Sequence, residues 1–289
     1  MSEFSLEQEL AGSFDPQIWD GTVLFFVQGL WRSGTTWLAR MIAEHPDIYV
    51  CQHELQLYPG GLDIALFQQP LQSNPFMLER FRLKQKVGFL TMLLHLKNKE
   101  KPEAKLFCDR SPGGNVQMIH ELFPQACIVI IVRDGRDICI STAFMREKNF
   151  GKREFLFPHN GAYQFDPTYL KAMAQIYAHF VTGYYELQNQ FPDLVMILRY
   201  EDLLTDTSSW MEKVFGFFKV SMDESQLAKI CSMHSFESET ARKPGEEDRL
   251  SFARKAVVGD WKNYFSEESS DLYMEEAGDA LRLAGYLGE

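Results

Sequence analysis

Five short runs of apolar, β-branched and aromatic residues alternate along this chain with longer stretches of helical pattern. The runs cover residues 22–28, 48–51, 105–108, 128–132 and 194–198. Each run is too short to be a helix, and its apolar character is continuous, as in strands that are buried on both faces. Strands that alternate with helices favour a parallel sheet. We therefore expect an α/β fold with a central parallel sheet flanked by helices.

The rest of the chain is consistent with one domain. Residues 76–96 and 168–191 carry long helical patterns, and residues 149–167 and 237–250 are rich in Gly, Pro or charge and are expected to be exposed loops. There is no internal repeat and no linker that divides the chain. Since one core can serve 289 residues, we expect a single domain over residues 1–289.

Composition excludes several classes of function. The chain has 29 Lys and Arg against 40 Asp and Glu, a net charge of −11, so a general electrostatic nucleic-acid surface is not expected. Its apolar runs are far shorter than the ~20 residues that span a bilayer. The amino terminus lacks the basic and apolar pattern of a signal peptide, and five cysteines without a C-x-x-C pair favour reduced thiols. We expect a cytoplasmic protein without membrane association.

The loop after the first run, Gly29-Leu-Trp-Arg-Ser-Gly-Thr-Thr-Trp37, is the most informative segment. It follows a strand and opens a helix, where backbone N–H groups can surround an anion. A tight turn explains its glycines, but not the string of one cation and three hydroxyls. A Walker A loop places Lys directly after its last Gly, but Thr35 stands there and the cation is Arg32. The loop therefore predicts an anion site that suits Mg²⁺–triphosphate poorly.

Two later blocks also indicate anion binding. Arg133 falls at the end of the fourth run, where open α/β sheets place ligands, and Ser141 follows about two helical turns later. An ion pair of Arg133 with Asp134 or Asp137 is the alternative interpretation. The other block is Arg254-Lys-Ala-Val-Val-Gly-Asp-Trp-Lys-Asn263, a basic loop tip before a helix start.

Together these blocks resemble sulfotransferases that use 3′-phosphoadenosine 5′-phosphosulfate (PAPS). The first loop is similar to their 5′-phosphosulfate loop, with Arg32 where Lys is usual in cytosolic members. The resemblance implies a P-loop-like sulfotransferase fold, with PAPS as co-substrate and 3′-phosphoadenosine 5′-phosphate (PAP) as product. It implies that the sulfuryl end is held by Arg32, Ser33, Gly34, Thr35 and Thr36, and that Trp37 stacks on the adenine.

The same resemblance extends to the other nucleotide contacts. It implies that Arg133 and Ser141 bind the 3′-phosphate and that Arg254 and Lys255 close a loop over it. Ala256 stands where the family has Gly, so the backbone is strained if its φ is positive. Weaker matches imply adenine contacts from Tyr200, in Arg-Tyr-Glu-Asp-Leu, and from Phe236, in His-Ser-Phe.

The expected chemistry is in-line displacement at sulfur, which needs a base for the acceptor and positive charge at the leaving oxygen. Arg32 is assigned to the leaving charge, with Arg110 as a second cation. The stretch around Glu54 resembles heparan-type sulfotransferases, in which the corresponding Glu is the base; His53 is the alternative. No His or carboxylate cluster has metal-ligand spacing, so we expect no metal.

We expect sulfuryl transfer from PAPS to a hydroxyl or amine of a small-molecule acceptor, such as a natural product. A carbohydrate acceptor is the alternative, hinted by Arg32 and Glu54. A P-loop phosphotransferase and a non-catalytic nucleotide-binding module are the rival classes. The oligomeric state stays open, because Glu267 replaces an apolar residue of the segment through which cytosolic members often dimerise.

Overall fold

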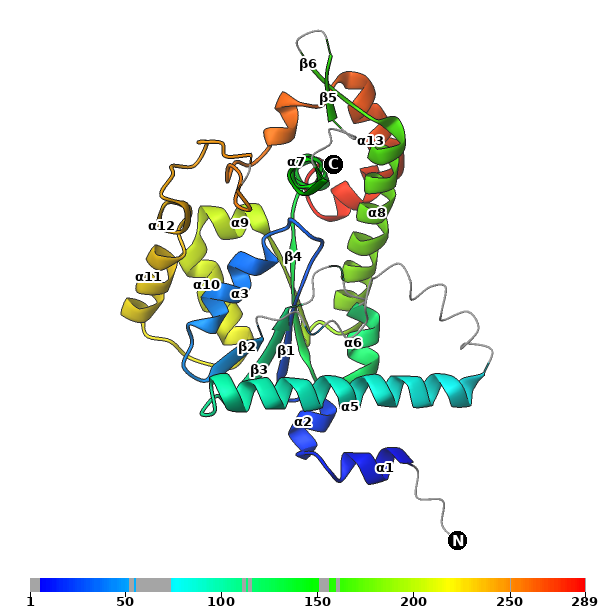
Figure 1. Ribbon diagram of the computed structural model, residues 1–289, viewed down its shortest axis with the longest axis vertical. Coiled ribbons are helices and arrows are strands. Elements are labelled where there is room, and N and C mark those ends of the chain that lie inside the picture. Colours follow the sequence, from blue (N-terminus) through cyan, green and yellow to red (C-terminus); the bar gives the residue numbers. More distant parts are fainter. Residues whose placement is uncertain are drawn as a thin grey trace.

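Figure 1 shows a computed structural model of the chain. The structure describes residues 6–51, 55, 74–110, 113, 116–150, 156–159, 162–249 and 251–288. Its centre is a five-stranded sheet with every pairing parallel, in the order β2-β3-β1-β4-β7. The strands are β1 (Leu24–Gln28), β2 (Ile48–Cys51), β3 (Leu106–Arg110), β4 (Cys127–Val132) and β7 (Val195–Arg199). The predicted α/β fold with a central parallel sheet is confirmed.

Helices cover both faces of this sheet (Figure 1). One face packs against α3 (Thr35–Ala43), α9 (Tyr200–Thr205), α10 (Thr207–Phe217) and α11 (Glu224–Met233). The other packs against α5 (Pro75–Glu100), α6 (Val116–Leu122), α7 (Gly135–Phe150), α8 (Pro167–Gln190) and α13 (Glu267–Leu283). Short elements complete the described chain: α1 (Leu6–Ala11), α2 (Pro16–Asp20), α12 (Phe236–Thr240) and the 3₁₀ helix η1 (Asp260–Asn263).

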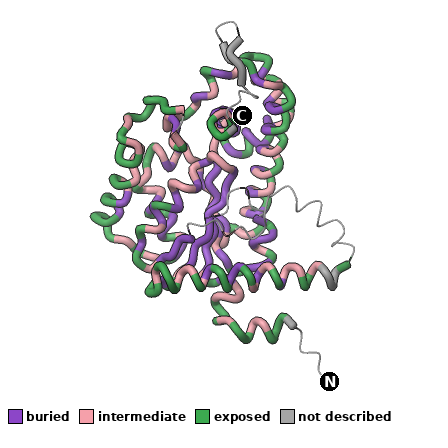
Figure 2. The backbone as a smooth tube through the Cα atoms, viewed as in Figure 1, coloured by how far each residue is buried: buried purple, intermediate pink, exposed green. Residues whose placement is uncertain are grey.

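The central strand β1 shows why its run of residues is apolar throughout. Phe25 and Val27 belong to the core on the α3 face, whereas Leu24 and Phe26 belong to the core on the α8 face. All four are at most 3% exposed, and the buried residues follow the strands through the middle of the molecule in Figure 2. Because successive side chains of a strand point to opposite faces, a doubly covered strand needs an apolar residue at each position. Truncating Phe26 to Ala is expected to cost about 3–5 kcal/mol of stability.

The long helices begin and end close to where their sequence pattern predicted. Helix α8 starts at Pro167, whose missing N–H costs nothing in the first turn, and the side chain of Asp166 accepts a hydrogen bond from the N–H of Tyr169 at 2.8 Å. The predicted loop at 149–167 differs, since it contains the antiparallel hairpin of β5 (Leu156–His159) and β6 (Ala162–Phe165).

The predicted loop at 237–250 is also more ordered than its composition indicated. It begins within α12, and its later part pairs with residues 251–258, which we call the basic loop. The N–H of Gly245 donates to the carbonyl of Lys255 at 2.9 Å, and the N–H of Asp248 donates to the carbonyl of Arg254 at 3.0 Å. Such pairing between backbones leaves no trace in composition, and it ties this segment to the basic loop.

The sheet order creates a crevice at the carboxyl ends of β1 and β4. The chain leaves β1 through α3 on one face, and it leaves the neighbouring strand β4 through α7 on the other face. Ligands of open α/β sheets bind where the connections diverge in this way.

Among the helices that the structure describes, none has the length and apolar character needed to span a membrane. All five cysteines are free thiols.

Candidate functional site

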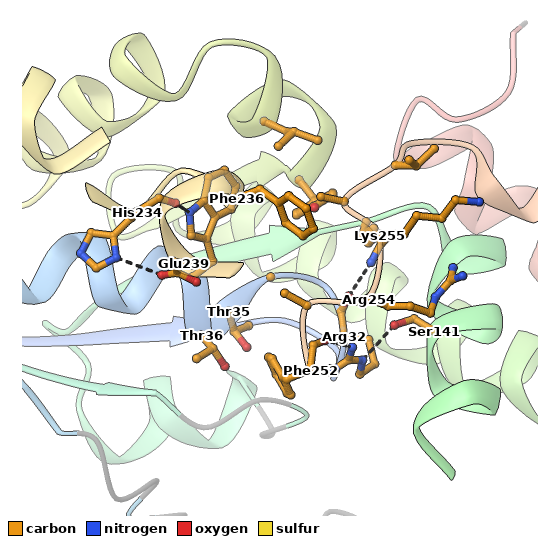
Figure 3. A pocket seen from close by; sticks show the side chains of 18 of the residues that line it. Arg32, Thr35, Thr36, Ser141, His234, Phe236, Glu239, Phe252, Arg254 and Lys255 are labelled. Carbon is orange, nitrogen blue, oxygen red and sulfur yellow. Dashed lines mark hydrogen bonds and ion pairs between the residues drawn. The ribbon is translucent and has the colours of Figure 1, made fainter. Parts of the chain in front are cut away.

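A pocket lies at this crevice, between the first loop, α7, α9 and the loop that precedes η1 (Figure 3). It gathers segments that are more than 200 residues apart in the sequence. Of the thirteen residues predicted to bind nucleotide, it is lined by all except Ser33: Arg32, Gly34, Thr35, Thr36, Trp37, Arg133, Ser141, Tyr200, Phe236, Arg254, Lys255 and Ala256. The three sequence blocks therefore form one site.

The first loop is shaped by two of its small residues. Gly34 has a φ of +101°, and a Cβ at this position would lie 2.8 Å from Cδ2 of Tyr200, so only glycine fits. Ser33 is fully buried and points away from the pocket, since its hydroxyl donates to the carbonyl of Leu30 at 2.6 Å. The side chain of Ser33 thus stabilises the turn and does not reach a ligand in the pocket. Helix α3 begins at Thr35, directly at the pocket wall.

Arg32 crosses the pocket and joins three segments. Its Nε donates to Oγ of Ser141 at 2.9 Å, its Nη2 donates to the carbonyl of Phe252 at 2.5 Å, and its guanidinium lies 4.3 Å from the centre of the Phe252 ring. Its Nη1 is buried without a hydrogen-bond partner among the described residues. Burial, followed by the nearby charges of Arg133 and Arg254, lowers the pKa of Arg32 to about 10.

Arg133 lies beside it, at the end of β4. Its Nη1 donates to the backbone carbonyl of Arg32 at 3.1 Å, and its guanidinium stacks 4.7 Å from the centre of the Tyr200 ring. The ion pair that was the alternative interpretation of Arg133 is also present, because its Nη2 lies 3.8 Å from a carboxylate oxygen of Asp137. Its Nε, like Nη1 of Arg32, is buried and has no partner in the described chain. Two guanidinium groups with N–H groups that lack a partner in the described chain, both at one pocket, have the chemistry to hold an anion.

The two cations of the third block are held differently. Arg254 pairs with Glu247 and Asp260, and Lys255 donates to Asp260 at 2.8 Å. In Figure 3 their side chains extend away from Thr35 and Thr36. Ala256 has a φ of +49°, so the condition under which alanine strains this turn is met.

Aromatic side chains line the other end of the pocket. Trp37 donates its Nε1–H to the carbonyl of His234 at 2.7 Å and meets Tyr200 edge to face at 6.0 Å between ring centres. Phe236 lies nearby, and the guanidinium of Arg242 lies 5.1 Å from its ring centre. Flat apolar faces beside an anion site suit a ligand that has both a planar ring and a charged end.

The structure adds residues that the sequence patterns did not single out. Phe252 lines the pocket and its ring lies against Arg32, although the residue is 61% exposed. Arg242 donates to the carbonyls of Ala253 and Arg254 at 2.6 and 2.8 Å and so holds the basic loop. Arg40 and Glu239 form an ion pair of 3.2 Å at the aromatic end. In the sequence, only the position of Phe252, two residues before Arg254, could have indicated a role in the pocket. Arg242 lies in a segment whose many charges indicated exposure to solvent.

Of the four predicted catalytic residues, the structure describes Arg32 and Arg110. Arg110 ends β3, is buried, and lies in register with Val27 of β1, outside the lining of the pocket. His53 and Glu54 lie outside the described residues. Among the described residues, no group of three or more His, Cys, Asp or Glu side chains is arranged to hold a metal ion.

Comparison with known proteins identifies the family. The sulfotransferase family matches residues 25–224, and the chain belongs to this family. The predicted membership of the sulfotransferase family is confirmed.

Two relatives and one solved structure show how far the likeness reaches. The chain is 24% identical to human sulfotransferase 1C2 over 269 residues, which cover 84% of this chain and 78% of the relative. It is 28% identical to flavonol 4′-sulfotransferase of Flaveria chlorifolia over 142 residues, which cover 44% of this chain and only 41% of that relative. The crystal structure of mouse sulfotransferase SULT7A1 complexed with PAP aligns over 99% of this chain and 96% of that one, with a TM-score of 0.61 and 21% identity. The last comparison confirms the predicted sulfotransferase fold.

Proposed function

We propose that this protein transfers the sulfuryl group of PAPS to a hydroxyl or amine of a small-molecule acceptor and releases PAP. The observation that carries the proposal is the pair of guanidinium groups of Arg32 and Arg133, each with an N–H that lacks a partner among the described residues and both at one pocket. Nucleotides with two separate phosphate positions would satisfy both groups. The complex of mouse SULT7A1 with PAP, which shares the fold, supports this choice of ligand.

The geometry of the pocket suggests an orientation for the nucleotide. The sulfuryl end would lie at Arg32 and the start of α3, where backbone N–H groups and the helix dipole favour an anion. The 3′-phosphate would lie at Arg133 and Ser141, with Lys255 able to leave Asp260 for it. The adenine would lie among Trp37, Tyr200 and Phe236.

In the proposed reaction the acceptor oxygen or nitrogen forms a bond to sulfur as the bond from sulfur to the bridging oxygen breaks. The bridging oxygen leaves with the electron pair as part of PAP. The acceptor's proton passes to a base, which we assign to Glu54, with His53 as the alternative. Arg32 stabilises the charge on the leaving oxygen and keeps its own proton, since even its lowered pKa of about 10 is well above neutrality.

We assign the acceptor to the small-molecule class, and the flavonol named for one relative supports this assignment. A single domain in the cytoplasm is part of the same proposal. Two observations support it: both cores share one sheet, and the cysteines are free thiols, as expected in a reducing compartment.

Calorimetry with PAP and ATP tests the nucleotide assignment. We expect PAP to bind clearly more tightly than ATP, because ATP has no 3′-phosphate for Arg133. Equal affinities would contradict the assignment. Turnover of labelled PAPS with a panel of phenols, alcohols and amines tests the acceptor class and should persist in EDTA, whereas a strict requirement for Mg²⁺ would favour phosphotransfer.

A further inference from the structure

Asp137 is a buried carboxylate that connects two separate parts of the pocket. It lies in the first turn of α7 and is 2% exposed. Its Oδ2 accepts a hydrogen bond from the N–H of Gly259 and its Oδ1 accepts one from the N–H of Trp261, both at 2.8 Å. On its other side, Oδ2 lies 3.8 Å from Nη2 of Arg133. One side chain therefore contacts both the cation at the end of β4 and the turn that follows the basic loop.

Asp260, which lies between Gly259 and Trp261, binds both cations of the basic loop. Asp260 is also 2% exposed, and its carboxylate pairs with Arg254 and Lys255 and accepts a hydrogen bond from Nδ2 of Asn263 at 3.0 Å. Asp137 fixes the backbone immediately before and after Asp260, so it also fixes the position from which Asp260 holds the two cations. The sequence had offered Asp137 only as an ion-pair partner of Arg133.

We infer that Asp137 is a positioning residue for nucleotide binding, which holds the loop of residues 251–258 against Arg133 so that the pocket closes on the 3′-phosphate. This inference rests on the proposed binding of PAP.

Simple electrostatics makes the opposite prediction, which gives the inference a sharp test. Asp137 places a negative charge 3.8 Å from Arg133, at the place proposed for a phosphate. If Asp137 did nothing but neutralise Arg133, its removal would strengthen the binding of an anion. If Asp137 positions the loop, its removal weakens binding in spite of the gain in positive charge.

Asp137 also titrates in an accessible range. Burial raises the pKa of Asp137 to about 6, and the charge of Asp134 acts in the same direction, whereas Arg133 and the N–H groups of Trp261 and Gly259 oppose the rise. Tyr200, on α9, is a further titratable group that interacts with it. Because protonation occupies one acceptor oxygen, the hold on residues 259–261 is expected to weaken as the pH falls through about 6.

The experiment measures the dissociation constant of PAP by calorimetry for the wild type and for Asp137→Asn at pH 7.5 and at pH 5. We expect the variant to bind about tenfold more weakly at pH 7.5, the effect of losing one charge-assisted hydrogen bond. We expect the ratio of the two dissociation constants to shrink towards one at pH 5, where the wild type has also lost the carboxylate. The ratio cancels the titration of PAP itself, which both proteins share.

Glu201→Gln is the matched control. Glu201 is a buried carboxylate near the same strand end, and it accepts hydrogen bonds from the N–H of Asp134 at 3.1 Å and the hydroxyl of Tyr286 at 2.6 Å. These contacts lie away from the basic loop. Substitution of Glu201 is therefore expected to lower thermal stability, but to leave the ratio of the PAP dissociation constants of variant and wild type near one at both pH values. A purely structural role of Asp137 would make the two variants behave alike.

The outcomes separate this inference from the proposed function. Absence of PAP binding by the wild type would overturn both. Binding by the wild type together with equal or tighter binding by Asp137→Asn, or a ratio independent of pH, would overturn the role of Asp137 alone. Should the variant fold poorly, hydrogen exchange in the wild type gives the answer: protection of the Gly259 and Trp261 amides, corrected for intrinsic rates, should fall as the pH passes below 6, and constant protection would contradict the inference.

Discussion

Nη1 of Arg133 donates a hydrogen bond to the backbone carbonyl of Arg32 at 3.1 Å, across 101 residues of sequence. The bond joins Arg133 to Arg32 and fixes the end of β4 to the loop that follows β1. Both guanidinium groups keep an N–H without a partner among the described residues. A site that already holds its donors in place loses little free energy to reorganisation when an anion develops or binds there.

Replacing Arg133 by Ala is expected to weaken PAP binding by roughly ten- to a hundredfold. The substitution removes charge-assisted hydrogen bonds of about 1.5–3 kcal/mol and leaves the core untouched. Calorimetry measures the effect, with Arg199→Ala as the control, because Arg199 ends the neighbouring strand β7 and donates to the carbonyl of Gly285 away from the pocket. An unchanged dissociation constant for Arg133→Ala would limit Arg133 to its structural contacts with Asp137, the carbonyl of Arg32 and the ring of Tyr200.

Arg32→Met should reduce turnover without lowering the melting temperature of the nucleotide-free protein. The folded-state pKa of Arg32, about 10, lies below its ordinary value of 12.5, so the charged form disfavours the folded state at every pH below 10. This cost disappears as the pH rises from 10 to 12.5. An assay with labelled PAPS measures the turnover. Thermal unfolding at pH 7.5, with and without PAP, measures the stability: without ligand the variant should match or exceed the wild type, and it should gain little from PAP. A clear loss of stability without ligand would show that the contacts of Arg32 with Ser141 and Phe252 outweigh its desolvation.

Ala256→Gly should stabilise the protein. Ala256 adopts a φ of +49°, which costs an L-residue about 1–2 kcal/mol, and glycine avoids this cost but gains freedom in the unfolded chain. The net gain is up to about 1 kcal/mol, or roughly 2–4 °C in melting temperature for a chain of this size. Ala253→Gly in the same loop is the control and should destabilise, since its φ is not positive. Equal shifts for the two variants would contradict the assigned strain.

Glu54→Gln tests the proposed base. The amide keeps the shape of the carboxylate but cannot take up the acceptor's proton, so kcat should fall by roughly 10²–10⁴-fold with PAP binding nearly unchanged. His53→Asn should reduce kcat only a few-fold. If the two effects are reversed, His53 is the base. With an amine acceptor, repeating both assays at lower pH, where the amine is protonated, should increase the dependence on the base.

The sequence predicted most of the fold because its strands are buried on both faces. An apolar run such as Ile48–Cys51 has no room for polar residues, so its limits are visible in the sequence and agree with β2. Most of the pocket lining was predicted from the resemblance to sulfotransferases. For Arg133 there was an additional reason in the sequence, because a residue that follows a parallel strand lies at the edge of the sheet where ligands bind.

What the sequence did not show are contacts made by side chains with distant backbone groups. Asp137 accepts from two N–H groups more than 120 residues away, and Arg242 donates to carbonyls of the basic loop. Every residue type has a backbone carbonyl and every type except proline has a backbone N–H, so no sequence pattern marks the partner. The side chain of Ser33 illustrates the converse, because it lies within the most informative motif and yet turns inward to Leu30.

The reach of Arg32 has a consequence for the kinetics of folding. Its guanidinium contacts Ser141 and Phe252, which lie 109 and 220 residues further along the chain. Contacts that close such long loops have a high entropic cost and are expected to form after the local helices and the first strand pairs. A ligand bound at Arg32 would then stabilise the native state but not the rate-limiting transition state. PAP should therefore slow unfolding and leave the rate of refolding unchanged. Bound nucleotide would then prolong the lifetime of the folded protein without helping the chain to fold.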